Sequence, residues 1–257
     1  MPGVQAMNQH LFILTGASRG LGLAMAEQLL RSTHTLLCIS RQPSAALTTR
    51  ARDSGSQLEQ WPLDLEHSVP ASAVLEQWLG SRSVKDYASA TLINNAGALA
   101  RIGPLSAADP LDLACALRVG LEAPMLLSSV FLRATGSWGV PRKVLNISSG
   151  LGRRAMASQA AYCAAKAGMD HFTRCLALEE ALKPDGAKVC SLAPGVIDTD
   201  MQAQLRGAEA GSFPDQGNFA NLMSSGQLTP ATEAAARILA YLARPDFGSQ
   251  PVADVRD

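Results

Sequence analysis

The stretch HLFILTGASRGLGLAMAEQLLRS, residues 10–32, decides the fold class. It begins with a short apolar run and ends with the apolar spacing of a helix, and three glycines, Gly16, Gly20 and Gly22, lie between the two. A buried strand that passes through a glycine turn into a helix is the first unit of an alternating strand–helix fold. We therefore expect an α/β architecture from this stretch alone.

The same alternation continues along the chain. Further strands are predicted at 34–41, 57–65, 90–97, 142–150, 187–195 and 250–255, and further helices at 110–134 (kinked near Gly120 and Pro124), 158–182 and 231–244. Apolar strands joined by helices of more than ten residues predict parallel pairing with helices on both faces. We expect one doubly wound domain over residues 1–257.

Composition narrows the class of protein. The 257 residues are 47% hydrophobic and 17% charged, and the formal net charge is zero, which gives no indication of a nucleic-acid or membrane partner. The N-terminal MPGVQAMNQH lacks the pattern of a secretory signal, and we expect no bilayer-spanning run. The five cysteines are odd in number and widely spaced, so we expect buried free thiols, no disulfide or metal site, and a cytoplasmic location.

The glycine loop suits a dinucleotide. Glycines let the backbone approach a pyrophosphate, and the helix N-terminus offers free N–H groups and the positive end of its dipole. The spacing here is Gly-x-x-x-Gly-x-Gly rather than the commoner Gly-x-Gly-x-x-Gly. The alternative is an ordinary tight turn between a strand and a helix.

Two arginines favour NADP(H) over NAD. The second strand ends in CISR, with Ser40 and Arg41 where an acid would bind the ribose hydroxyls of NAD, and Arg19 lies in the glycine loop. Guanidinium groups pair bidentately with the oxygens of a 2′-phosphate. The alternative is a pair of solvated surface arginines.

The stretch AAYCAAKAG, residues 160–168, places Tyr162 and Lys166 on one face of a helix. An ammonium beside a phenol should lower its pKa, and such a phenol exchanges a proton with a developing alkoxide. Ser149, at the end of the preceding strand, could hydrogen-bond a substrate carbonyl oxygen. The alternative is a tyrosine packed on the helix with the lysine beside it.

TGASRGLG, NNAG (94–97), NISS, YCAAKAG and APGVIDTDM (193–201) together resemble the short-chain dehydrogenase/reductase family. The resemblance implies a Rossmann-type fold with a seven-stranded parallel sheet and NAD(P)-dependent carbonyl or alcohol chemistry. It makes Tyr162 the general acid/base and Ser149 the residue that polarises the carbonyl, and Lys166 then binds the nicotinamide ribose. The cofactor residues that it implies are Gly16, Ser18, Arg19, Gly20, Leu21, Gly22, Arg41, Asp64, Leu65, Asn94, Ala96, Gly97, Tyr162, Lys166, Pro194, Gly195, Ile197 and Thr199.

YCAAKAGMDHF, PGVIDTDMQ and VADVRD look most like the sepiapterin reductase and benzil reductase branch. This likeness implies reduction of a vicinal diketone or a pterin side-chain carbonyl, with Ser149, Tyr162, Met201 and Asp254 as substrate residues. Asp254 would anchor a guanidine-like edge; its alternative is a solvated carboxylate. A 3-oxoacyl or hydroxysteroid-type reductase and a non-catalytic NADP-binding regulator remain alternatives.

Several features remain open. Residues 196–229, with Met201, Phe213, Phe219 and Met223, are either a substrate lid or core. Arg153 and Arg154 border the pocket or are solvated, and the second reading is favoured. Gly120 stands where the family usually has an Asn that supports a proton path. The resemblance also implies a homodimer or homotetramer formed through the helices at 110–134 and 158–182.

Overall fold

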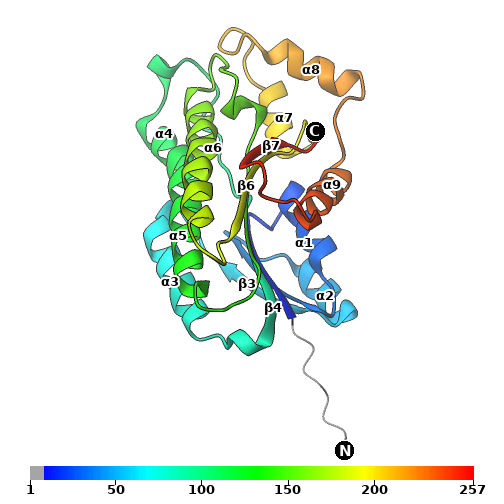
Figure 1. Ribbon diagram of the computed structural model, residues 1–257. Coiled ribbons are helices and arrows are strands. Elements are labelled where there is room, and N and C mark those ends of the chain that lie inside the picture. The colour runs from blue at the N-terminus through cyan, green and yellow to red at the C-terminus, as the bar shows by residue number, and fades with distance from the viewer. Residues whose placement is uncertain (1–8) are drawn as a thin grey trace, which may run out of the picture.

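The structure is a computed structural model that describes residues 9–257. Its centre is a parallel sheet of seven strands in the order β3-β2-β1-β4-β5-β6-β7 (Figure 1), which confirms the predicted seven-stranded doubly wound architecture. The strands are β1 (Gln9–Thr15), β2 (His34–Ser40), β3 (Gln57–Pro62), β4 (Tyr87–Asn94), β5 (Arg142–Ile147), β6 (Lys188–Ala193) and β7 (Val252–Asp254).

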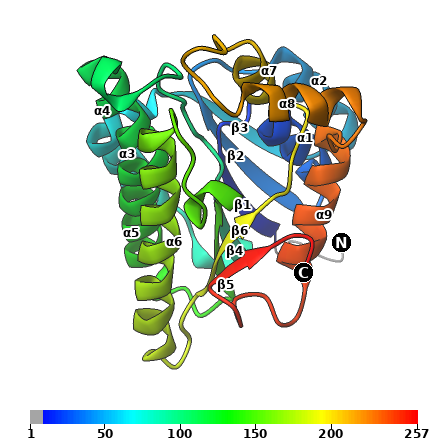
Figure 2. The ribbon, with the colours of Figure 1, turned by 90° about the horizontal axis from the view of Figure 1, so that it is seen from above.

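Helices cover both faces of this sheet. The helices are α1 (Gly20–Leu29), α2 (Ala45–Ser54), α3 (Ser68–Gly80), α4 (Pro110–Leu117), α5 (Ala123–Thr135), α6 (Ala160–Ala181), α7 (Asp200–Arg206), α8 (Gln216–Ser224) and α9 (Ala231–Ala243). Figure 2 shows α3, α5 and α6 on one side of the sheet and α1, α2 and α9 on the other, with α7 and α8 near one edge.

The strands divide the core into two layers because alternate side chains point to opposite faces. Leu11 and Ile13 of β1 pack on the layer that includes α3 and α5, whereas Leu14 packs on the layer that includes α1 and α9. Leu37 and Leu36 of β2 divide in the same way. The apolar runs seen in the sequence are therefore strands buried on both sides.

Some elements differ from the prediction. Helices α2 and α3 were not expected, and residues 196–229 contain α7 and α8. The predicted helix at 110–134 is divided into α4 and α5 by a π turn, Arg118–Glu122, which contains Gly120. Only Cys38 and Cys190 of the five cysteines, all free, are buried, so the expectation that most are buried is wrong. Most of the N-terminal stretch used to argue against a secretory signal, 1–8, lies outside the described residues.

The expectation about bilayer-spanning runs is also corrected. Pro110–Thr135 is long and apolar enough, by length and composition, to cross a membrane. Just over half of its most apolar window, 56%, is buried inside the protein. Leu127 and Phe131 of this segment belong to the core layer beneath α3, so α5 is a core helix of the fold.

The strand order reverses direction between β1 and β4. β2 and β3 lie on one side of β1, whereas β5, β6 and β7 extend from β4 in the other direction. In open α/β sheets the loops at the carboxyl ends diverge at such a point and leave a crevice for a ligand. The glycine loop follows β1 and NNAG follows β4, so both predicted cofactor motifs meet there.

Candidate active site

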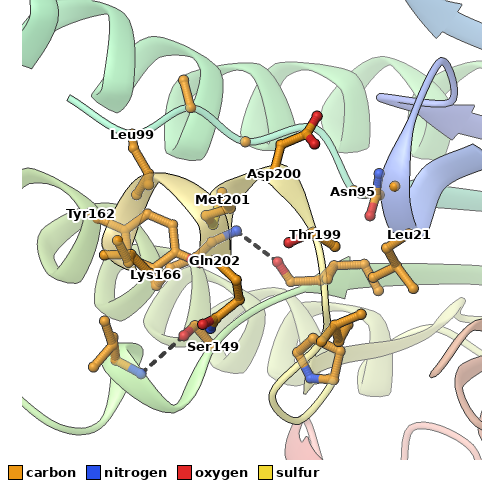
Figure 3. A pocket seen from close by; sticks show the side chains of 18 of the residues that line it. Leu21, Asn95, Leu99, Ser149, Tyr162, Lys166, Thr199, Asp200, Met201 and Gln202 are labelled. Carbon is orange, nitrogen blue, oxygen red and sulfur yellow. Dashed lines mark hydrogen bonds between the residues drawn. The ribbon is translucent and has the colours of Figure 1, made fainter. Parts of the chain in front are cut away.

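A cavity of about 1050 Å³ opens at this carboxyl edge. Every residue that the sequence predicted for cofactor or substrate lines it, with the exception of Asn94. Figure 3 shows Ser149, Tyr162 and Lys166 on one side, with Leu99, Met201 and Gln202 around them, and Leu21, Asn95 and Thr199 on the other. The structure therefore brings the two predicted halves of the site together.

The glycine loop is packed so closely that side chains would not fit. Gly16 has φ +70°, and a Cβ there would lie 2.9 Å from the Cα of Ala96. A Cβ on Gly22 would lie 2.0 Å from the carbonyl oxygen of Gly16. The Asn95 side chain donates hydrogen bonds to the carbonyl oxygens of Thr15 and Gly16, at 3.0 and 3.3 Å. Asn95 thus braces the loop, a role that the sequence argument missed although the residue lies within NNAG.

The N-terminus of α1 is suited to a phosphate. Its N-cap residue, Arg19, makes no side-chain capping hydrogen bond, so no side chain in the described part of the chain occupies the first N–H groups of the helix. Uncapped N–H groups and the positive end of the helix dipole attract an anion. With the glycine loop, this geometry fits the pyrophosphate of a dinucleotide, whose adenosine end would lie toward Asp64 and Leu65.

The two predicted arginines lie in different surroundings. Arg19 donates a 2.8 Å hydrogen bond to Asp200, and both side chains are well exposed. Arg41 is exposed at the end of β2, lines the cavity and forms no ion pair with any residue of the described chain. A 2′-phosphate could therefore be met by Arg41 without breaking an existing pair.

Asn94 is the predicted cofactor residue that the structure places elsewhere. Its amide nitrogen donates to the Asn146 side-chain oxygen at 2.8 Å and to the Ser128 hydroxyl at 3.2 Å. It is 1% exposed, because as the last residue of β4 it points into the interior between strand and helix. Its neighbour Asn95 faces the cavity instead.

Tyr162 and Lys166 share one face of α6. The Lys166 Nζ lies 5.7 Å from the centre of the Tyr162 ring and donates a 2.7 Å hydrogen bond to the carbonyl oxygen of Ile147, the last residue of β5. Burial lowers the pKa of Lys166 to about 8, and the negative charge of Asp170 opposes that shift. The lysine is therefore largely protonated at neutral pH.

The phenol does not behave as the sequence argument expected. Burial raises the pKa of Tyr162 above its usual value, and the neighbouring Ser149 hydroxyl opposes that shift only in part. The pKa of the phenol is therefore raised, whereas the sequence argument expected it to be lowered. At neutral pH Tyr162 thus carries its proton and can donate it.

The Ser149 turn rests on a buried carboxylate. Ser149 accepts a 3.1 Å hydrogen bond from the backbone N–H of Leu151, and its hydroxyl lies beside that of Tyr162 at the cavity. Beneath the turn, Asp170 accepts hydrogen bonds from the hydroxyls of Ser148 and Ser191, at 2.5 and 2.6 Å. Asp170 lies four residues after Lys166, so one helix face carries both the lysine and the group that holds the strand ends.

Arg153 completes this support. Its Nε lies 3.4 Å from Asp170 and its Nη2 donates to the carbonyl oxygen of Ala253 in β7, at 2.6 Å. Arg153 is thus paired with a buried carboxylate although its own side chain is 34% exposed, and it does not line the cavity. Arg154 is exposed and lines the cavity.

The segment at 196–229 supplies one wall of the cavity. Phe213 and Phe219 are buried and form a small apolar cluster with Leu205, so these two phenylalanines are core. Met201 lines the cavity, as Figure 3 shows, whereas Met223 is exposed. The segment therefore has its own small core and turns part of its surface toward the site.

A model described as short chain dehydrogenase matches residues 10–210. The chain belongs to the short-chain dehydrogenase family. The match extends from β1 through the Tyr162 helix to α7, so it includes the glycine loop, NNAG and the Ser149, Tyr162 and Lys166 motifs.

Individual members of the family give closer likenesses. The chain is 36% identical over 235 residues to the benzil reductase ((S)-benzoin forming) of Bacillus cereus, covering 91% of this chain and 94% of that protein. It is 32% identical over 256 residues to the sepiapterin reductase of Meriones unguiculatus, covering 95% of each. The predicted branch of the family is thereby confirmed.

Solved structures agree on the fold. A short-chain dehydrogenase/reductase from Burkholderia vietnamiensis superposes with a TM-score of 0.62 at 32% identity, covering 98% of this chain and 99% of that one. The 3-oxoacyl-[acyl-carrier protein] reductase of Brucella melitensis, in complex with NAD, gives a TM-score of 0.79 over 96% of each chain. At 22% identity, this second likeness concerns the fold alone.

This chain has a glycine, Gly120, at the position where the family usually has an Asn. It is buried in the π turn, and a Cβ on it would lie 3.0 Å from the Cβ of Ala165, the residue before Lys166. The glycine therefore lets the π turn pack closely on the helix that carries Tyr162 and Lys166. A side chain at position 120 would require either the π turn or α6 to shift slightly.

Proposed function

We propose that the protein is an NADPH-dependent carbonyl reductase that reduces one ketone of a vicinal diketone. The observation that carries the proposal is the meeting of Ser149, Tyr162 and Lys166 in the same cavity as the glycine loop. A proton donor and a hydrogen-bond donor on one side, with a phosphate cradle on the other, suit hydride transfer to a carbonyl group.

Each side chain has a distinct role in this proposal. When bound, the reduced nicotinamide supplies the hydride that the carbonyl carbon receives. Tyr162 donates its proton to the carbonyl oxygen, and the raised pKa of this phenol keeps it protonated at neutral pH, as reduction requires. Ser149 donates a hydrogen bond to the same oxygen and orients it. Lys166 holds the nicotinamide ribose by its ammonium group.

The preference for NADPH rests on charge. Arg41 and Arg19 both line the cavity, and no acid follows β2, where a carboxylate would repel a 2′-phosphate. A guanidinium pairs with phosphate oxygens through two parallel hydrogen bonds. These features favour the phosphorylated dinucleotide.

The substrate class rests on the relatives and on the cavity wall. The B. cereus relative is a benzil reductase and the M. unguiculatus relative a sepiapterin reductase. Leu99 and Met201 flank Tyr162, as Figure 3 shows, and give a bulky apolar ketone a surface to pack on. We propose that residues 196–229 act as a lid over this substrate.

The proposal is tested by NADPH consumption with benzil, aliphatic diketones, a pterin diketone and a 3-oxoacyl thioester, with NADH in parallel. We expect the highest kcat/KM for a vicinal diketone with NADPH. A higher value for the thioester would support the 3-oxoacyl alternative instead. Cofactor binding without turnover of any carbonyl would contradict the proposal and favour a regulator.

We further propose that the protein is a cytoplasmic homodimer or homotetramer. Leu178 of α6 and Leu182, the residue after this helix, are 72% and 87% exposed, and Leu111 of α4 is 77% exposed. Exposed leucines on these helices give a second copy an apolar surface to pack on. Light scattering at micromolar concentration should give a multiple of the chain mass, and a monomer would contradict this part.

A further inference from the structure

One wall of the cavity carries a buried carboxylate. Asp254, the last residue of β7, is 8% exposed, and it is the one carboxylate among the cavity-lining residues of the described chain that is buried. A buried carboxylate facing a ligand site is a strong acceptor for paired N–H groups. Of the two readings of Asp254 that the sequence leaves open, a substrate residue or a solvated carboxylate, its burial argues against the second.

This carboxylate already has a cationic partner. The Arg256 Nε donates to Asp254 Oδ1 and its Nη2 to Oδ2, both at 2.7 Å. The backbone N–H of Arg256 adds a 3.1 Å hydrogen bond to Oδ1. Both side chains line the cavity. The pair therefore occupies both carboxylate oxygens in the bidentate geometry that a ligand with two parallel N–H groups would need.

We propose that Arg256 is a specificity-determining residue, which closes Asp254 to ligands with an amidine-like or guanidine-like edge, such as 2-aminopyrimidinone rings. The inference rests on the proposed function in taking this cavity as the substrate site. A diketone has carbonyl acceptors and no such N–H edge, so it does not compete with Arg256. The closed pair thus favours the dicarbonyl over the pterin as substrate class.

Arg256 can be substituted without disturbing the core of the protein. Its side chain is 64% exposed, and within residues 9–257 its side-chain hydrogen bonds go only to Asp254. Truncating it leaves no hole in the core. The hydrogen bond from Arg256 has the largest effect on the pKa of Asp254 and lowers it, burial raises it, and the charge of Arg153 lowers it by a smaller amount.

Three other charged residues of the described chain surround the pair, two from the Ser149 turn and one from the end of the chain. Arg153 approaches from the Ser149 turn, where it is fixed by Asp170 and the Ala253 carbonyl. Arg154, from the same turn, lines the cavity. Asp257, the last residue of the sequence, accepts a 3.3 Å hydrogen bond from the backbone N–H of Asp254. None of these three side chains adds a second carboxylate to the wall of the cavity.

The test measures binding rather than turnover. Unsubstituted pterin, which is fluorescent, is titrated against the NADP⁺-loaded protein. We expect weak binding by the wild type and at least tenfold tighter binding by Arg256→Met, because the bidentate acceptor becomes free. The double variant Arg256→Met/Asp254→Asn should lose that gain. Arg244→Met is the matched control, since Arg244 forms an equivalent two-bond pair with Asp246 on the surface.

The outcomes separate this inference from the proposed function. A gain in Arg256→Met alone, absent in Arg244→Met and in the double variant, supports the inference. Equal pterin affinity in wild type and Arg256→Met, with NADP⁺ binding intact in both, overturns it. Diketone reduction is measured on the wild type only. Its absence would contradict the proposed function, whereas the pterin titration would still decide the role of Arg256.

Discussion

Arg19 of the glycine loop and Asp200 of α7 are joined by a 2.8 Å hydrogen bond although they are 181 residues apart in the chain. The bond ties the predicted phosphate site to the predicted lid. Both side chains are more than 60% exposed, so the pair contributes little to stability. One guanidinium cannot face Asp200 and a 2′-phosphate fully at the same time, so we expect Asp200 to compete with the proposed cofactor for Arg19.

Asp200→Asn should tighten NADP⁺ binding. Removing the competing charge frees Arg19, and an exposed pair of this kind is worth up to about 1 kcal/mol, or roughly fivefold in Kd. NAD⁺ binding should stay unchanged. Calorimetric titration of both dinucleotides tests this, with Asp198→Asn as control, an acid two residues earlier that faces Arg206. Equal tightening for NAD⁺ would contradict the competition.

Arg41→Ala should weaken NADP⁺ selectively. Loss of a hydrogen bond to a charged group costs about 1.5–3 kcal/mol, which is roughly 10- to 100-fold in Kd. NAD⁺ lacks the phosphate and should bind as before. Arg50→Ala is the control, an exposed arginine that pairs with Glu27 away from the cavity. An equal loss for both dinucleotides would show that Arg41 does not read the 2′-phosphate.

The sheet and its main helices could be predicted because their apolar spacing is strong. β1 and β2 are continuous apolar runs, and α6 and α9 are long periodic segments. Helix α2 was missed because it buries only Leu47 and Ala51 and is otherwise polar. α7 and α8 were missed for a related reason, since they are short and pack on a small cluster rather than on the sheet.

The pH dependence of stability should reveal the burial of Lys166. Its pKa is lowered from 10.5 to about 8, so between these values the unfolded chain binds more protons than the folded one. The free energy of unfolding from this group therefore rises with pH across that window, by up to about 3 kcal/mol.

Lys166→Met removes this contribution. Urea unfolding at pH 7.5 and pH 10 gives the free energy of unfolding of wild type and variant. The wild-type value minus the variant value should be larger at pH 10 than at pH 7.5. Lys85→Met, which replaces an exposed lysine, is the control. A difference that does not change with pH would mean that Lys166 is solvated when the protein is folded.

Gly120→Asn should destabilise the protein rather than improve it. The new Cβ would lie 3.0 Å from the Cβ of Ala165, and such overpacking costs about 1–3 kcal/mol. Gly80→Ala is the matched control, because a Cβ on this helical glycine meets nothing within 4 Å. Thermal unfolding should show a lower Tm for Gly120→Asn only. A raised Tm together with raised turnover would show that the glycine is a defect of the site.

The residues of the candidate site that belong to sequence motifs could be predicted. Properties that depend on burial and on contacts in the folded protein could not. The cofactor and catalytic residues other than Asn94 could be placed in one cavity from order and spacing. The direction of the Tyr162 pKa could not be predicted, because it depends on burial rather than on the helical spacing to Lys166. The pairing of Asp254 with Arg256 could not be predicted either, because nothing in the sequence marked Arg256, two residues later, as its partner.

The central claim, that Tyr162 gives its proton to a substrate carbonyl, is tested most directly by Tyr162→Phe. The variant should bind NADPH within about threefold of wild type, because the phenol contributes no charge to the cofactor, while kcat for diketone reduction falls by about 10²–10⁴. Both are measured on one preparation, by NADPH fluorescence and by NADPH consumption with benzil. A Tyr162→Phe protein that binds NADPH and still reduces the diketone at the wild-type rate would contradict the account.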